Sequence, residues 1–153
     1  MLLSLGASVV SGDIQPPTAT EPAETPAFLF LQTNVTSWAD LSTLFKKAKE
    51  HHGRIDYVFA NAGIGPRANY LAIETDENGD LKEPTHEVLD VNLKSVINTA
   101  CLAVHFMKQQ PEGGGVVLMG SSTGLQPLRA PDYCKLRAKY CVVDRVLPAY
   151  RIV

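Results

Sequence analysis

The chain of 153 residues lacks any long hydrophobic run. A helix that crosses a bilayer needs roughly 20 consecutive apolar residues, so a membrane-spanning protein is not expected. An excess of charge is also missing, because the formal net charge at pH 7 is −2. Without a basic surface there is no electrostatic reason to expect a nucleic acid or an anionic membrane as partner.

Cysteine is scarce, and patterns that bind metal are absent. Cys101, Cys134 and Cys141 form no CxxC pair, and their odd number does not suit a disulfide framework. The first ten residues, MLLSLGASVV, are apolar but carry no positive charge, so no secretory signal peptide is expected. The four histidines do not have the spacing of zinc ligands. These features favour a cytoplasmic protein with reduced thiols and no metal site.

The chain does contain alternating strand-like and helix-like segments. The expected strands are ASVVSG (7–12), FLFLQT (28–33), IDYVFA (55–60) and GGGVVLMG (113–120). The apolar runs at 28–33 and 55–60 are typical of strands buried on both faces. One helix is expected between the N-cap Ser37 and Gly53, and a second roughly from His86 to Gln109. This alternation predicts an α/β fold with a doubly wound parallel sheet.

Polar and small residues follow three of these strands, at the sheet edge where such folds bind ligands. Asp13 ends the first strand. In a fold that binds a dinucleotide, an acid at this position accepts hydrogen bonds from the hydroxyls of the adenosine ribose and repels a 2′-phosphate. Asn61 and Gly63 suit a tight turn that passes close to a ligand. Ser121 and Ser122 follow the last strand. Each of these residues, taken alone, is also compatible with an ordinary turn or loop.

Two further features lie in the expected helices. Asn92 occurs in the middle of the second helix, where asparagine is a mediocre helix former, so it is either solvent-facing or needed for a polar task. Tyr133 and Arg137 are four residues apart, in a last helix that Pro131 opens, and share one helix face. Lys135 and Lys139 point elsewhere and cannot replace Arg137. The alternative is a chance pair on an exposed helix.

Taken in order, these segments resemble the short-chain dehydrogenase/reductase family. The matching segments are GASVVSGD, QTNV, FANAG, DVNLKSV, VVLMGSSTG and DYC. They are most similar to the branch of 15-hydroxyprostaglandin dehydrogenase, whose members favour NAD, and the resemblance runs from about Leu2 to Cys134. It implies a Rossmann-like fold that is incomplete. The first strand with its TGxxxGxG turn and the C-terminal strands are missing. Residues 1–153 then form a partial NAD-binding domain, and residues 134–153 a divergent tail.

The resemblance implies a role for each matching position in holding NAD. Asp13 matches the acid that selects NAD, and Ile14 lies beside it near the adenine. Asn34 and Val35 match an Asp-Val pair that contacts the adenine, with asparagine in place of the usual aspartate. The core of the family's NNAG turn is matched by Asn61, Ala62 and Gly63.

The resemblance also implies catalytic roles. Asn92 matches the asparagine that holds a water in a proton relay. Ser121 matches the serine that polarises the carbonyl, with Ser122 as its competitor. Tyr133 matches the catalytic acid/base. Arg137 occupies the place of a lysine that lowers the pKa of this tyrosine, which is about 10 in the free amino acid.

The implied function is a NAD-dependent oxidoreductase that interconverts a secondary alcohol and a ketone of a small lipophilic substrate. Because Arg137 supplies charge but cannot pass a proton, and both ends of the family pattern are missing, weak or absent activity is expected. The alternative is a non-catalytic remnant that acts through dimer-type contacts of the helices bearing Asn92 and Tyr133, as a homo-oligomer. An unrelated flavodoxin-like binding module is a third hypothesis, and the Asn-Ala-Gly, Ser and Tyr series argues against it.

Overall fold

The computed structural model describes residues 2–17, 25–67, 72, 74–121 and 142–146. A short 3-10 turn at Leu3–Leu5 precedes the first strand, β1 (Val9–Asp13), and β2 (Phe28–Gln32) follows. Helix α1 (Trp38–His52) leads to β3 (Tyr57–Ala60). The chain then enters α2 (Glu87–Leu89), a π-helical turn (Asp90–Lys94) and α3 (Ser95–Met107), and continues to β4 (Gly114–Leu118) and β5 (Val142–Val146).

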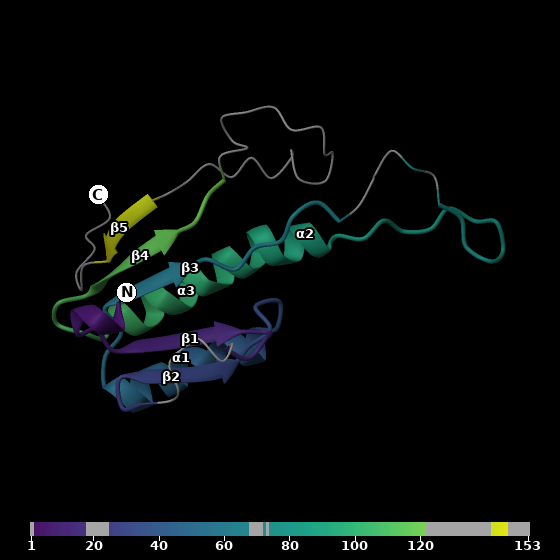
Figure 1. Ribbon diagram of the computed structural model, residues 1–153. Helices are drawn as coiled ribbons and strands as arrows, with labels where there is room; N and C mark the ends of the chain where they lie inside the picture. The colour runs from purple at the N-terminus through teal and green to yellow at the C-terminus, as the bar shows by residue number, and fades with distance from the viewer. Residues whose placement is uncertain (1, 18–24, 68–71, 73, 122–141, 147–153) are drawn as a thin grey trace, which may run out of the picture.

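The described strands form two separate sheets. Strands β1 and β2 pair in parallel, and β3 pairs in parallel with β4. No described strand joins β1 to β3, as the resemblance implies for a sheet without its first strand. In Figure 1 the arrows of β1 to β4 point in one direction, so their carboxyl ends lie toward the same side of the molecule. This side is where a doubly wound fold binds its ligands.

Strand β5 corrects the expectation that no strand lies in the C-terminal tail. It runs antiparallel to β4, with Val117 opposite Val143. Its sequence, VVDRV, is rich in valine, whose branched Cβ favours extended backbone. The resemblance to the family ends before this segment, so it gave no reason to expect a strand there. An antiparallel strand also differs from the all-parallel sheet that the alternating pattern predicts.

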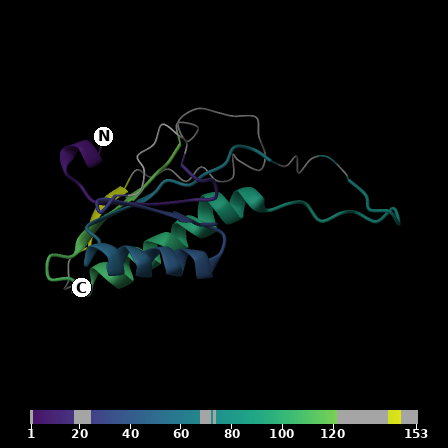
Figure 2. The same ribbon diagram turned by 60° about the horizontal axis from the view of Figure 1, so that its bottom comes forward.

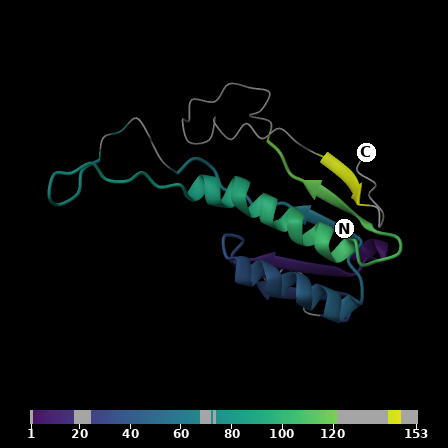
Figure 3. The ribbon, with the colours of Figure 1, turned by 180° about the vertical axis from the view of Figure 1, so that it is seen from behind.

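Both long helices cover the same face of the strands, as Figures 2 and 3 show from below and from behind. The core lies between this helical layer and the strands. It consists of Leu41, Phe45, Ile55, Leu102, Ala103, Met107 and Val116. The rings of Phe45 on α1 and Phe106 on α3 stack with centroids 5.7 Å apart. The hydrophobic effect therefore holds both sheets on one pair of helices.

The expectation that the apolar runs are buried on both faces is wrong. Tyr57 and Phe59 on β3 are 68% and 53% exposed, and on β2 only Phe28 is fully buried. Alternate side chains of a strand point to opposite faces. Since both helices lie on one face, the side chains on the other face have no helix among the described residues to pack against.

The predicted boundaries of α1 are confirmed. The hydroxyl of Ser37 accepts a hydrogen bond from the backbone N–H of Asp40 and caps the helix, while Gly53 ends it with a φ of 76°. The second predicted helix is confirmed as one helical segment from Glu87 to Met107, in which the π-helical turn separates α2 from α3. None of the described helices combines the length and the apolar character needed to cross a membrane.

Candidate active site

The first part of the candidate site is the pair of strand ends at β1 and β2, which we call the β1–β2 end (Asp13, Ile14, Asn34 and Val35). The backbone N–H of Thr33 donates to the carbonyl of Asp13 at 2.8 Å, which holds the two strand ends together. The Asp13 carboxylate is exposed and accepts a hydrogen bond from the backbone N–H of Gln15 at 3.0 Å. Ile14 is 59% exposed. An exposed carboxylate can accept hydrogen bonds from the hydroxyls of a ribose, and an exposed apolar side chain beside it can contact the face of a base.

Asn34 and Val35 lie in the turn between β2 and α1, and this turn is held by a hydrogen-bond network. The backbone N–H of Asn34 donates to Oδ2 of Asp40 at 3.0 Å, and the Ser37 hydroxyl donates to Oδ1 of Asp40 at 2.8 Å. The bond from the Asn34 backbone, followed by that from Ser37, holds the pKa of Asp40 below its ordinary value. Asp40 therefore fixes the position of Asn34 while keeping its own charge.

Gly12 brings β1 close to α1. A Cβ atom at this residue would lie 2.7 Å from Cδ2 of Leu44 and 3.0 Å from Oγ1 of Thr33. Packing therefore explains the glycine that directly precedes Asp13. Because it has no side chain, β1 can approach α1 closely.

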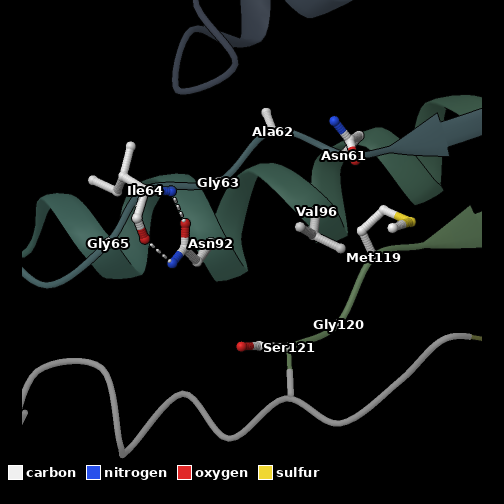
Figure 4. Close-up of a pocket in the computed structure, with 10 residues that line it drawn as sticks. All are labelled: Asn61, Ala62, Gly63, Ile64, Gly65, Asn92, Val96, Met119, Gly120 and Ser121. Atoms are coloured by element: carbon white, nitrogen blue, oxygen red, sulfur yellow. Dashed lines mark hydrogen bonds between the residues drawn. The ribbon is translucent and has the colours of Figure 1, made fainter. Parts of the chain in front are cut away.

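The second part of the candidate site is a pocket of about 370 Å³ at the carboxyl ends of β3 and β4. It is lined by Asn61, Ala62, Gly63, Ile64, Gly65, Asn92, Val96, Met119, Gly120 and Ser121. Figure 4 shows the loop of residues 61–65 on one side of this pocket and Ser121 on the other, with Asn92 and Val96 between them. The structure therefore brings together three groups of predicted residues that lie far apart in the sequence.

Asn92 binds the backbone of the pocket loop through both ends of its amide. Its Oδ1 accepts from the backbone N–H of Ile64 at 2.8 Å, and its Nδ2 donates to the carbonyl of Ile64 at 2.8 Å. The π-helical turn Asp90–Lys94 carries Asn92, and such turns often occur at functional sites. The side chain thus has a polar partner and is not simply solvent-facing. A relay water remains a prediction.

Gly63 lies directly against this asparagine. A Cβ atom at Gly63 would be 3.4 Å from Oδ1 of Asn92. Ala62 and Gly63 are exposed on the pocket side, so their backbone is accessible to a ligand. This arrangement fits the prediction that the Asn61-Ala62-Gly63 segment approaches a bound molecule.

Sequence reasoning missed several residues of the site. Ile64, Val96 and Met119 line the pocket, and Asp40 positions Asn34. The S-x-x-D pattern of a reciprocal cap at Ser37 to Asp40 could have identified Asp40. Nothing in the local sequence marks Ile64, because its contribution is a backbone N–H and carbonyl that any residue could supply.

Some predicted site residues lie outside the described residues. These are Ser122, Tyr133 and Arg137, together with Cys134 and Cys141 of the thiol prediction. Cys101 is exposed and has a reduced thiol. Within the described residues, the structure contains no group of three or more side chains that could hold a metal ion.

A sequence model of the short chain dehydrogenases matches residues 1–133. The chain belongs to this family. Short-chain dehydrogenase/reductase ascJ of Acremonium egyptiacum is 53% identical over 136 residues, which cover 87% of this chain and 45% of that protein. Human 15-hydroxyprostaglandin dehydrogenase, which is named as NAD(+)-dependent, is 32% identical over 117 residues. These cover 74% of this chain and 37% of the human enzyme.

A solved structure shows the same type of fold. An NADPH-dependent 3-quinuclidinone reductase from Rhodotorula rubra superimposes with a TM-score of 0.58 at 22% identity, over 72% of this chain and 40% of that one. At this identity the likeness shows the fold alone, and it confirms the Rossmann-like α/β class. The chain spans less than half the length of these relatives.

Proposed function

We propose that this chain carries the nucleotide-selecting and substrate-facing part of a NAD-dependent oxidoreductase that interconverts a secondary alcohol and a ketone. The observation that carries this proposal is the shared pocket of Asn92, Ser121 and the loop of residues 61–65. It lies at the carboxyl ends of β3 and β4, and Asp13 lies at the carboxyl end of β1. Family membership supports the same reaction class.

The described residues fit the two ends of a nicotinamide dinucleotide. At the β1–β2 end, the exposed Asp13 carboxylate would accept hydrogen bonds from the ribose hydroxyls, and Ile14 and Val35 would contact the base. At the pocket, the accessible backbone of Ala62 and Gly63 would lie beside the nicotinamide ribose. When bound, the cofactor accepts or donates the hydride. Among the described residues, no glycine-rich turn opens a helix that could contact the pyrophosphate.

The proton chemistry is assigned to the chain's own residues. Ser121, with Ser122 as its competitor, would donate a hydrogen bond to the substrate oxygen, and Tyr133 would exchange the proton with that oxygen. Arg137 would supply the positive charge that lowers the pKa of Tyr133. A guanidinium is effectively never deprotonated, so it cannot take part in the proton transfer, and we expect slow turnover at most.

NAD is preferred over NADP in this proposal because of Asp13. A carboxylate repels a 2′-phosphate and accepts hydrogen bonds from a 2′-hydroxyl. The name of the human relative points to NAD, whereas the structural neighbour is named for NADPH, and that neighbour is similar in fold alone. The substrate we propose is a small lipophilic alcohol or ketone, since Val96 and Met119 give the pocket apolar walls.

The test is a titration of the full chain with NADH and with NADPH, in which NMR spectra measure the binding. We expect both to bind more weakly than micromolar, with NADH the tighter of the two. An Asp13→Ala variant should lose this difference, whereas Asp80→Ala, a matched change in an exposed loop, should keep it. An unchanged preference in Asp13→Ala would contradict the assignment of Asp13. Micromolar binding of NADH would contradict the expectation that this chain binds the cofactor weakly.

A second candidate function is a non-catalytic protein that associates with its own copies. The observation in its favour is a stripe of exposed residues along one side of the π-helical turn and α3, formed by Leu93, Ile97 and Cys101. Leu93 and Ile97 are 40% and 54% exposed, and the spacing of four residues places all three on one helix face. This stripe would form the contact between two copies.

A further inference from the structure

Residues 74–82 form a small hairpin, which we call the arm. Thr75 and Leu81 form an antiparallel bridge, and the backbone N–H of Lys82 donates to the carbonyl of Glu74 at 2.8 Å. Every residue of the arm is exposed. Figures 1 and 3 show this segment extending away from the helices and strands. The arm is therefore held by its own hydrogen bonds and is open to solvent.

The tip of the arm contains the only Asn-Gly pair in the sequence, Asn78-Gly79. Asn78 is exposed, and no described residue forms a hydrogen bond with its side-chain amide. Gly79 has a φ of 85°, and a Cβ atom at this residue would meet no atom within 4 Å. The side-chain amide of Asn78 is thus unrestrained, and the backbone nitrogen that follows it is not crowded by a side chain.

We propose that Asn78 is a site of deamidation through a cyclic succinimide. The backbone nitrogen of Gly79 loses its proton to hydroxide and attacks the side-chain carbonyl carbon of Asn78. The new C–N bond closes a five-membered ring, the bond to the side-chain nitrogen breaks, and this nitrogen leaves as ammonia. Water then opens the ring at either carbonyl carbon and gives aspartate or isoaspartate. One water is consumed, one ammonia is released, and nothing is oxidised or reduced.

Other described asparagines are held where this reaction is hindered. The side-chain amide of Asn92 bonds the backbone of Ile64 through both of its ends. Oδ1 of Asn34 accepts two hydrogen bonds from Thr36. Asn98 lies within α3, where the helical backbone is fixed. Each of these residues would have to leave its present conformation before the following nitrogen could attack it.

Asn61 is the closest comparison for Asn78. It is also exposed, and no described residue forms a hydrogen bond with its side-chain amide. The residue that follows it is Ala62, however, whose methyl group hinders the approach of the backbone nitrogen, whereas glycine has no such group. Asn61 and Asn78 therefore differ mainly in the residue that supplies the attacking nitrogen.

Asp76 controls the rate at the tip of the arm. Its carbonyl accepts from the N–H of Gly79 at 3.1 Å, and its Oδ1 accepts from the N–H groups of Asn78 and Asp80 at 2.9 and 3.0 Å. The bond to Gly79 occupies the N–H that must lose its proton, so the turn has to open before the ring can close. Removing the carboxylate of Asp76 deletes two of the bonds that keep the turn closed, and it should speed the reaction.

Either product changes the arm. Each adds one negative charge to a segment that already contains four acidic residues and one lysine. Isoaspartate also inserts a methylene group into the main chain, which displaces the groups that pair across the tip. Deamidation therefore opens the hairpin irreversibly.

The experiment incubates the full chain at mildly alkaline pH and follows each asparagine by peptide mapping and mass spectrometry. Deamidation raises the mass of a peptide, and fragmentation spectra distinguish isoaspartate from aspartate. We expect Asn78 to convert faster than Asn61, which is an internal control in the same digest, by about tenfold or more. Asn78→Gln should abolish the conversion of the arm.

Two variants test the role of Asp76. Asp76→Ala should accelerate the conversion of Asn78 by about two- to tenfold, the effect of one hydrogen bond. Asp80→Ala removes the same charge from the same turn without removing a side-chain hydrogen bond, so it should leave the rate unchanged.

The outcomes separate the site from its control. Conversion of Asn78 no faster than that of Asn61 would overturn the assignment of the site. Equal rates in Asp76→Ala, Asp80→Ala and wild type would overturn the role of Asp76. These rates are measured without cofactor or substrate, so failure here and failure of the proposed function are independent results.

Discussion

At the scale of single residues, Asn92 links the helical segment to the loop that lines the pocket. The sequence shows only an asparagine in an unfavourable place within a helix, and both a solvent-facing and a functional interpretation are consistent with that. The two hydrogen bonds to Ile64 explain why asparagine is needed, because only an amide both donates and accepts with this geometry. The residue therefore positions the loop that lines the pocket.

We predict that Asn92→Ala destabilises the chain by about 1–3 kcal/mol, the sum of two partly buried hydrogen bonds. Urea denaturation measures this free energy of unfolding. The matched control is Asn98→Ala on α3, which removes the same side chain from the same helical segment. Hydrogen exchange at the Ile64 amide should accelerate in Asn92→Ala alone. Equal losses of stability in the two variants would show that the loop contact contributes little.

At the scale of elements, Gln110 joins the two connections that enter β3 and β4 at their amino ends. Its side chain is 4% exposed, and its Nε2 donates to the carbonyls of Ile55 and Gly113 at 2.9 and 3.0 Å. Its Oε1 accepts from the backbone N–H of Ile55 at 2.7 Å. One glutamine thus links the entry to β3 with the entry to β4, at the end of these strands opposite to the pocket.

Gln110→Ala should cost about 2–4 kcal/mol, because it leaves the N–H and the carbonyl of the buried Ile55 without partners. The preceding residue offers the control. Gln109 is exposed and bonds only within its own helix end, so Gln109→Ala should change the free energy of unfolding by no more than about 0.5 kcal/mol. Chemical denaturation of wild type and both variants measures these free energies of unfolding. A cost for Gln110→Ala as small as that for Gln109→Ala would refute the linking role.

At the scale of the whole molecule, the fold leaves a large apolar surface exposed. The helices cover one face of the strands, while Tyr57 and Phe59 are exposed on the other. Strands β1 and β3 each have one edge that no described strand pairs with. Exposed apolar patches and unpaired edges favour association. The stripe Leu93, Ile97 and Cys101 adds a third surface of this kind, along the π-helical turn and α3.

We predict that the stripe is the principal contact between copies, because its exposed side chains lie along one helix face. Ile97→Lys should weaken self-association at least tenfold in sedimentation velocity experiments. Trp38→Lys provides the control, since Trp38 is 53% exposed, nearly as much as Ile97, but lies at the start of α1. If Phe59→Lys disrupts association and Ile97→Lys does not, the contact lies on the open face of β3 instead.

The sequence alone determined the order of strands and helices from β1 to β4, the ends of α1 and the family. These follow from local causes: Ser37 can cap a helix, Gly53 adopts a positive φ, and apolar residues recur with the period of the element they build. The resemblance to the family also implied that Asn92 and Ser121 share a site, and both residues line the pocket.

Only the tertiary structure decided which faces are buried and which backbone group each side chain binds. The apolar residues of IDYVFA are the same whether or not a helix covers them. The exposure of Tyr57 and Phe59 therefore depends on both helices lying on one face of the strands. The partner of Asn92 lies 28 residues earlier in the chain, and the partner of Gln110 lies 55 residues earlier. Contacts between residues so distant in the sequence form when elements pack, and no local pattern encodes them.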